Sequence, residues 1–246
     1  MSVTGLILGF SLSGLISYLA YQKRSLTIDG ALVAIGVGTL IYGFAGGFAY
    51  FILMVFFFSS SLIGFFDKEK IPSERNGIQV LANASLASLM AILYGVYQHQ
   101  GFLALMITSI GVSAADTWAS EVGKKSTSRP FHIFKLQPMD KGLSGAVSIR
   151  GMIASLAAGL TFAFLASFVI QSFLIVFIVG AISFSGSIID SMLGTVQVKY
   201  MNPITQTLTE KKASTHAYHS GIRYLGNNGV NFLSNLFSVI IMFAII

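Results

Sequence analysis

Residues 102–123 read FLALMITSIGVSAADTWASEVG. A helix needs about 20 apolar residues to cross a bilayer, and the first part of this stretch is apolar over nearly that length. Its first charged residue is Asp116, and the next is Glu121. The stretch predicts a membrane-spanning helix over 102–120 that carries a carboxylate inside the hydrocarbon boundary.

The composition of the whole chain agrees with a membrane protein. Of its 246 residues, 54% are hydrophobic and 10% are charged, whereas about a quarter of the residues of a soluble domain are charged. The chain has no cysteine, so disulfides and thiol chemistry are excluded. The net charge of +6 is interpreted as a topology signal and not as a sign of nucleic acid binding, because excess Lys and Arg mark cytoplasmic loops.

Hydropathy along the chain predicts an all-α, polytopic membrane helix bundle with about eight transmembrane helices, as a single integral membrane domain over 1–246. The expected spans are 3–20, 28–43, 45–66, 76–97, 102–120, 144–169, 172–195 and 228–246. The second span is short, and Gly43, Gly46 and Gly47 predict a tight turn into the third.

The positive charges are confined to one side of the predicted bundle. All 15 Lys and Arg residues fall in the stretches 21–29, 67–76, 121–150 and 197–227. The opposite connections, around 43–47, 97–101 and 169–173, carry no charge. The positive-inside rule then predicts cytoplasmic basic loops, with both termini outside the cell membrane. Lys23, Arg24, Lys68, Lys70 and Arg75 are interpreted as topology anchors.

Two amide triplets with equal spacing suggest an internal repeat. They are Asn76, Gln79 and Asn83 in one helix start, and Asn228, Asn231 and Asn235 in another. The spacing places each triplet on one helical face. We therefore predict a parallel duplication of a four-helix unit, with repeats 1–100 and 101–246. The amides either join helices or line a shared polar cavity, and the matching of two triplets favours the cavity.

Two carboxylates are expected deep in the membrane. Asp116 and Asp190 follow long apolar runs, and a charge at the bilayer centre costs about 2.5–3.5 kcal/mol even on lenient scales, which makes such residues functional candidates. Glu121 lies about 140° from Asp116 on an ideal helix, so the two converge only if the helix unwinds or ends near Ser120. Carboxylates with hydroxyls and no thiols suit Mg²⁺ held together with phosphate oxygens.

A glycine-rich segment precedes the sixth predicted span. Lys141, Gly142, Ser144, Gly145 and Ser148 lie where small residues and a helix N-terminus can bind an anion. The alternative is a loop whose glycines allow close helix packing. The segment is not a P-loop, because the Gly-Lys-Ser/Thr ending is absent.

Together these motifs resemble the family of transmembrane protein 19 and the plant phytyl-phosphate kinase of the vitamin E pathway. The resemblance runs through most of the chain from residue 75 onward, and the most specific motif is Asp-Thr-Trp-Ala-Ser-Glu at 116–121. The other motifs begin at Arg75, Gly142, Gly186 and Asn227. The chain departs from the family pattern at 140–146, where Pro-x-Gly-Thr-x-Gly-Gly is usual, and at 227–228, where Asn-Asp is expected.

The resemblance implies a nucleotide-dependent kinase, with CTP as the expected donor, that converts a prenyl monophosphate to the diphosphate. It implies that Asp116, Glu121 and Asp190 are the catalytic and Mg²⁺-binding residues. The residues expected to bind substrate or phosphate are Asn76, Gln79, Asn83, Lys141, Gly142, Ser144, Gly145, Ser148, Ser187, Asn228 and Asn231.

Two other functions fit parts of the pattern. A multi-pass transporter would also use membrane-embedded carboxylates, although the uncharged opposite side offers no polar path. A non-catalytic lipid-binding protein would need neither metal nor nucleotide. The expected partners are a prenyl-phosphate lipid, a nucleotide and the bilayer, with no nucleic acid.

Overall fold

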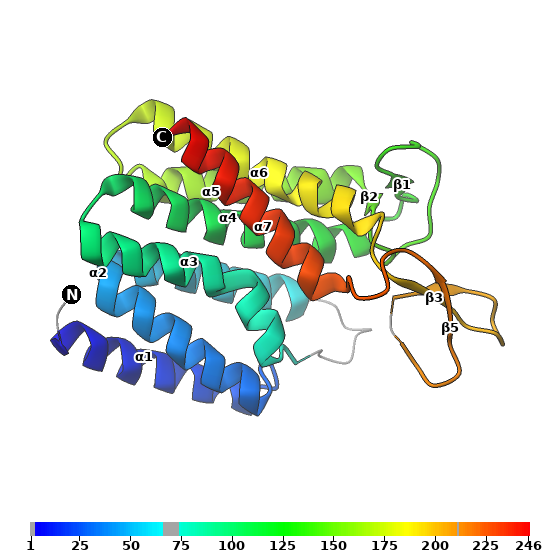
Figure 1. Ribbon diagram of the computed structural model, residues 1–246, viewed down its shortest axis with the longest axis horizontal. Coiled ribbons are helices and arrows are strands. Elements are labelled where there is room, and N and C mark those ends of the chain that lie inside the picture. Colours follow the sequence, from blue (N-terminus) through cyan, green and yellow to red (C-terminus); the bar gives the residue numbers. More distant parts are fainter. Residues whose placement is uncertain (1–2, 66–73, 211) are drawn as a thin grey trace.

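The computed structural model describes residues 3–65, 74–210 and 212–246, and its long helices lie side by side along one axis (Figure 1). They are α1 (Val3–Gln22), α2 (Ile28–Phe65), α3 (Gly77–Tyr97), α4 (Gln100–Lys124), α5 (Ile149–Ala166), α6 (Phe173–Gly194) and α7 (Asn227–Ile245). All seven are long and apolar enough to cross a membrane. The predicted helical membrane bundle is confirmed.

Helix α2 supplies two of the eight expected spans. It contains 38 residues, about 57 Å of helix, against a hydrocarbon core of about 30 Å. Its backbone breaks at Gly46, with φ 87° and ψ 179°, and the ribbon reverses direction there (Figure 1). Because a positive φ is strained for residues with a side chain, glycine permits this turn, as the sequence predicted.

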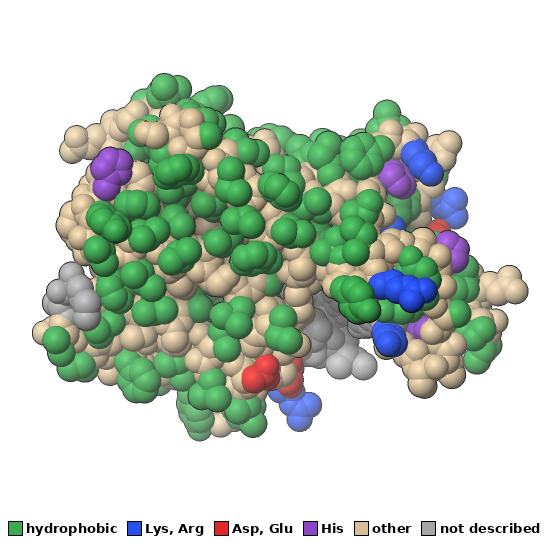
Figure 2. All heavy atoms as spheres, in the orientation of Figure 1, with side chains coloured by type: hydrophobic (Ala, Val, Ile, Leu, Met, Phe, Trp, Pro, Cys, Tyr) green, Lys and Arg blue, Asp and Glu red, His purple; other side chains and the backbone are tan. Residues whose placement is uncertain are grey.

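The two ends of the bundle differ. Both chain termini lie at the end where α2 reverses (Figure 1). On the face shown in Figure 2, apolar side chains cover the helices, and Lys and Arg gather near the strands and at the connection from α1 to α2. Most of the basic stretch 67–76 and Lys211 lie outside the described residues. The described basic loops and the termini therefore lie at opposite ends of the bundle (Figure 1), and the side of the membrane that each end faces stays a prediction.

The basic end also carries two small sheets that the sequence did not predict. β1 (Phe131–His132) pairs antiparallel with β2 (Ala146–Val147). In the second sheet, β3 (Lys199–Met201) lies between β4 (Leu208–Thr209) and β5 (Ala217–Ser220). The expected span 144–169 is wrong at its start, because residues 146–147 pair as a strand and α5 begins only at Ile149.

Helix α4 is the centre of the bundle. Its residues from Leu103 to Ala115 are all buried, and it contacts α2, α3, α5, α6 and α7. Several glycines bring the neighbouring helices close: a Cβ at Gly159 of α5 would lie 2.7 Å from the carbonyl oxygen of Gly180 in α6. Small residues are used in this way where membrane helices pack tightly. The central position of α4 carries Asp116 into the interior.

Helices α3 and α7, which carry the two amide triplets, also pack against each other. The duplication into 1–100 and 101–246 stays a prediction.

Candidate functional site

Asp116 of α4 and Asp190 of α6 meet near the basic end of the bundle, and their carboxyl groups are close enough to hydrogen-bond when one of them is protonated. Ser234 of α7 donates from Oγ to Oδ2 of Asp190 at 2.9 Å. Two carboxyl groups in contact cannot both be ionised unless something positive lies between them. The pair therefore holds a shared proton or a cation.

The pair lies inside the bundle but is not sealed. Asp116 precedes Lys124, the last residue of α4, by about two helical turns, or about 12 Å along the axis. Both residues are half-buried. Each therefore keeps some exposed surface below the level at which α4 ends.

Amide side chains of α3 and α7 meet beside this pair, and the shared polar cavity that the sequence favoured stays a prediction. The Asn231 amide lies between Asn83 and Asp190. In one orientation its Nδ2 is 3.5 Å from Oδ1 of Asn83; in the other it donates to Oδ2 of Asp190 at 3.3 Å and to the carbonyl of Asn227 at 2.9 Å. The second orientation gives the shorter hydrogen bonds.

A buried hydrogen-bond chain ties these helices to α4. Asn235 donates from Nδ2 to the carbonyl of Ser109 at 3.0 Å and to Oγ of Ser113 at 2.8 Å. Ser113 in turn donates to the carbonyl of Asn83 at 2.7 Å. Buried polar groups that are satisfied in this way fix the geometry of their surroundings. This chain of hydrogen bonds holds α3, α4 and α7 in fixed positions around the carboxyl pair.

Asn76 and Gln79 have a structural role at the start of α3, and the predicted contact of these residues with substrate stays a prediction. Asn76 is the N-cap of α3, where its Oδ1 accepts from the backbone of Gln79 at 3.0 Å, and Oε1 of Gln79 accepts from the backbone of Asn76 at 2.9 Å. This is a capping box. Asn228 lies half-buried in the first turn of α7.

Glu121 does not join the two aspartates. Helix α4 continues through Lys124, so Glu121 stays on a different side of the helix from Asp116, and its Oε1 lies 3.0 Å from the ammonium of Lys124. Within the described ranges, no three His, Asp or Glu side chains lie together as a metal site. The predicted three-carboxylate site is reduced to Asp116 and Asp190.

The glycine-rich segment is a loop and not the start of a helix. Ser148 is the N-cap of α5 and accepts from the backbone of Gly151 at 3.1 Å. Gly142 and Gly145 both have positive φ, and a Cβ on Gly145 would lie 2.8 Å from Cγ2 of Thr195. The glycines thus form the loop and pack it on the end of α6, which is the alternative that the sequence left open.

Ser144 of this loop already binds an anion from the protein itself. Its backbone N–H donates to Oε1 of Glu210, and its Oγ donates to Oε2 at 3.0 Å. Lys141 donates from Nζ to the carbonyl of Ser126. The position predicted for a phosphate at Ser144 is therefore taken by a carboxylate, which has similar acceptor oxygens.

Glu210 and Arg75 are the residues that the sequence analysis missed. Glu210 follows β4 and acts electrostatically on Asp190, but it stands in a polar loop with no periodic signal. Arg75 was interpreted as an anchor. Burial lowers the pKa of its guanidinium below the usual value, and the charge of Glu121 offsets part of this shift.

Ser187 is also removed from the predicted set. It is buried in α6 and donates to the carbonyl of Phe184 at 2.9 Å. Its hydroxyl is satisfied within its own helix.

The groups around the carboxyl pair fit Mg²⁺. The ligand atoms available are carboxylate oxygens of Asp116 and Asp190, the hydroxyl of Ser234, and the amides of Asn83 and Asn231. Hard cations prefer oxygen ligands, and Mg²⁺ in particular binds one or two carboxylates together with phosphate oxygens. Because a cation can take the place of the shared proton between the two carboxyl groups, the site suits a divalent cation.

Apolar helices long enough to cross a membrane, with a carboxyl pair set inside them, define a polytopic integral membrane protein. The chain belongs to the DUF92 integral membrane protein family, whose model matches residues 11–239. This confirms the resemblance at the level of the family.

Three relatives show how widely this sequence pattern occurs. Protein PGR of Arabidopsis thaliana is 32% identical over 268 residues, which covers 94% of this chain and 92% of PGR. An uncharacterized membrane protein of Synechocystis is 33% identical over 77% of this chain and 74% of its own length. An uncharacterized membrane protein of Methanocaldococcus jannaschii is 27% identical over 71% of this chain and 76% of its own length. No solved structure matches the chain.

Proposed function

We propose that this protein is a membrane-embedded kinase that transfers the terminal phosphate of CTP, or of another nucleoside triphosphate, to a prenyl monophosphate. The product is the prenyl diphosphate. The observation that carries the proposal is the contact of Asp116 with Asp190 beside the hydroxyl of Ser234 and the amide of Asn231. The family resemblance described above supplies the substrate class.

The reaction requires the protein mainly to position the two reactants and to stabilise the charge on the transferred phosphate. An oxygen of the lipid phosphate forms a bond to the terminal phosphorus of the nucleotide, and the bond to the leaving nucleoside diphosphate breaks. Such transfers depend mainly on positioning and electrostatic stabilisation. A phosphate monoester oxygen is already nucleophilic, so the site needs no dedicated base.

The described residues can supply that positioning. Asp116 and Asp190 would hold Mg²⁺, which when bound neutralises charge on the phosphates. Asn83, Asn231 and Ser234 lie beside the pair and would orient phosphate oxygens.

Exposed cations lie at the basic end of the bundle. Arg129, Lys135 and Arg150 lie on the same end of the bundle, where a nucleotide would approach. We place this end in the cytoplasm and both termini outside, following the positive-inside rule, with the cell membrane as the location.

The proposal is tested with purified protein, Mg²⁺, CTP and a C15–C20 prenyl monophosphate. We expect prenyl diphosphate, measured by chromatography of a labelled lipid, and we expect no product when Mg²⁺ is chelated. No product with any of the four common nucleotides would rule out the kinase. Uptake of a labelled solute into proteoliposomes, driven by a proton gradient, would favour the transporter instead.

Glu210→Gln is expected to lower the KM for the nucleotide by about 3–10-fold and to leave kcat within about twofold. A nucleotide phosphate that binds Ser144 has to displace the carboxylate of Glu210, and a hydrogen bond to a charged group contributes about 1.5–3 kcal/mol. Initial rates over a range of nucleotide concentrations give both constants. Asp140→Asn is the control, because Asp140 is an exposed acid in the loop that carries Ser144. A fall in kcat for Glu210→Gln would instead place Glu210 in the transfer step.

A further inference from the structure

A mostly apolar pocket lies between α1, α2 and α3, with about 640 Å³ of empty space that includes its open mouth. Its walls include Leu26, Val37, Leu53 and Phe56, and it lies within segments long and apolar enough to cross the membrane. Ligand pockets commonly have mainly apolar walls with a few polar groups. The lining therefore suits a hydrocarbon chain.

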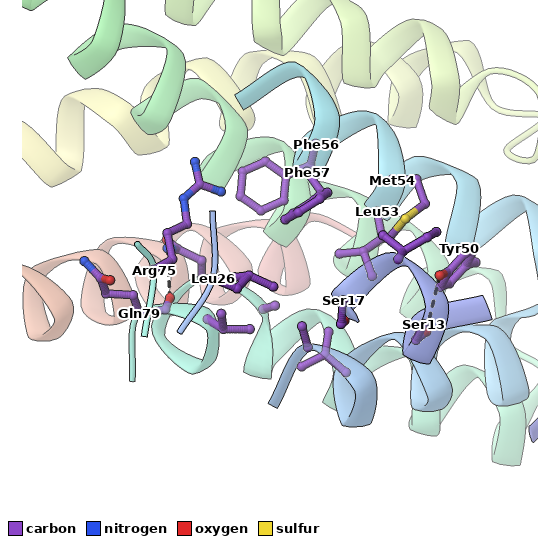
Figure 3. A pocket seen from close by; sticks show the side chains of 16 residues that line it. Ser13, Ser17, Leu26, Tyr50, Leu53, Met54, Phe56, Phe57, Arg75 and Gln79 are labelled. Atoms are coloured by element: carbon purple, nitrogen blue, oxygen red, sulfur yellow. Dashed lines mark hydrogen bonds between the residues drawn. The ribbon is translucent and has the colours of Figure 1, made fainter. Parts of the chain in front are cut away.

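Arg75 supplies a positive charge at one end of this pocket. Figure 3 shows Arg75 and Gln79 at one end, and Ser13 and Tyr50 at the other. The Arg75 backbone is fixed by its N–H, which donates to the carbonyl of Ser25 at 3.0 Å, and by its carbonyl, which accepts from Thr27 at 3.1 Å. These backbone bonds position the guanidinium without using it.

A cation in apolar surroundings is unfavourable unless an anion accompanies it. The Glu121 carboxylate acts on Arg75 through its charge, but burial has the larger effect on the guanidinium. An anionic group at the mouth of the pocket would complete this balance. The guanidinium also offers a fork of donors that matches phosphate oxygens.

The pocket leads toward the carboxyl pair. Asn83 lines the pocket, and the same residue contacts Asn231 and accepts a hydrogen bond from Ser113 through its carbonyl. Asn231 in turn lies within 3.3 Å of Asp190. A head group bound at Arg75 and Asn83 would therefore lie next to the site proposed for phosphoryl transfer.

Ser13 and Tyr50 line the far end of the pocket (Figure 3). Ser13 donates to the hydroxyl of Tyr50 at 3.3 Å, and a Cβ at Gly38 would lie 2.2 Å from Oγ of Ser13 and 3.1 Å from the Tyr50 ring. Seven helical positions separate Tyr50 from Phe57, another lining residue, which corresponds to about 10 Å. The pocket therefore extends along α2 for at least this length.

We propose that this pocket binds the hydrocarbon chain of a single-chain lipid monophosphate, and that Arg75 binds its phosphate. The assignment of this lipid as the phosphate acceptor rests on the proposed kinase function. The pocket itself does not depend on catalysis, so binding can be measured without nucleotide.

The test is binding of labelled geranylgeranyl monophosphate to the purified full chain in detergent, without nucleotide or Mg²⁺. Arg75→Gln is expected to weaken binding at least tenfold and Arg75→Lys to weaken it less, because lysine keeps the charge and loses the fork. Geranylgeraniol, which lacks the phosphate, should bind the wild type and Arg75→Gln equally.

A second variant tests the hydrocarbon end. Ser17 is buried and lines the pocket, so Ser17→Phe should fill it and reduce binding of the C20 lipid at least tenfold. Leu15→Phe is the matched control, because Leu15 is 58% exposed on the outer face of α1, and it should bind like the wild type. Unchanged gel-filtration profiles show that the variants are folded.

Wild-type binding by folded Arg75→Gln and Ser17→Phe would overturn the pocket, as would equal competition by two-chain phosphatidic acid. Binding that depends on both residues, without turnover on any nucleotide, would support the pocket and rule out the kinase. If the protein turns over substrate but neither substitution changes its lipid binding, the kinase proposal is supported and the pocket proposal is overturned.

Discussion

Asp116→Asn and Asp190→Asn should each reduce kinase turnover by about a thousandfold or more, with the folded structure retained. Asparagine has nearly the same shape as aspartate and can still accept from Ser234, which bonds to Asp190 at 2.9 Å. It removes the negative charge that a divalent cation requires. Loss of a single preorganised electrostatic contact in an active site costs about 10²–10³ in rate, and loss of the cation adds to this.

The measurement is the initial rate of prenyl diphosphate formation at saturating nucleotide and lipid. Glu74→Gln serves as a matched control, because Glu74 is an exposed acid at the same end of the bundle. It should keep the wild-type rate. Wild-type rates in both aspartate variants, with the control also normal, would remove the carboxyl pair from the reaction.

The second large effect is expected for stability. Gly159→Ala should destabilise the protein by about 1–3 kcal/mol, the range for overpacking a well-packed interior. The new methyl group would lie 2.7 Å from the carbonyl oxygen of Gly180, and a backbone atom cannot move aside as a side chain can. Helices α5 and α6 would have to separate. Thermal unfolding in detergent, followed by gel filtration, would show the lower midpoint.

Gly36→Ala is the matched control for this prediction. Gly36 lies in α2, and no atom lies within 4 Å of the position that its new methyl group would occupy, so alanine adds helix propensity there without a clash. Alanine is favoured over glycine by about 1 kcal/mol inside helices. The control should be as stable as the wild type or more so. An equal fall in both variants would mean that the α5–α6 contact is not the cause.

Hydropathy predicted the fold because the bilayer imposes a simple requirement on every span. The turn at Gly46 also followed from a local pattern, the glycines beside a short span, and the family resemblance implied that Asp116 and Asp190 share a site. The convergence of Asn83 and Asn231 followed from matched spacing. Hydropathy, the glycine turn and the amide spacing are each read within a single segment of the sequence.

The rest of the site depended on contacts between distant loops. Glu210 binds Ser144, 66 positions away, and nothing in either segment marks the other. Arg75 resembled an anchor because its burial depends on the packing of α1, α2 and α3. The capping role of Asn76 and Gln79 was predictable from the sequence, since an N-cap residue followed three positions later by glutamine is the signature of a capping box.

The depth of the carboxyl pair bears on how a lipid substrate would be handled. The pair lies about 12 Å inside the end of α4, and the pocket beside it runs between membrane-spanning helices. In the proposed reaction the hydrocarbon chain would stay among apolar groups throughout. Moving a 20-carbon chain into water would cost about 16 kcal/mol at about 0.8 kcal/mol per CH₂. The reaction avoids that barrier, so its rate should follow the mole fraction of lipid in the membrane and not its concentration in the surrounding water.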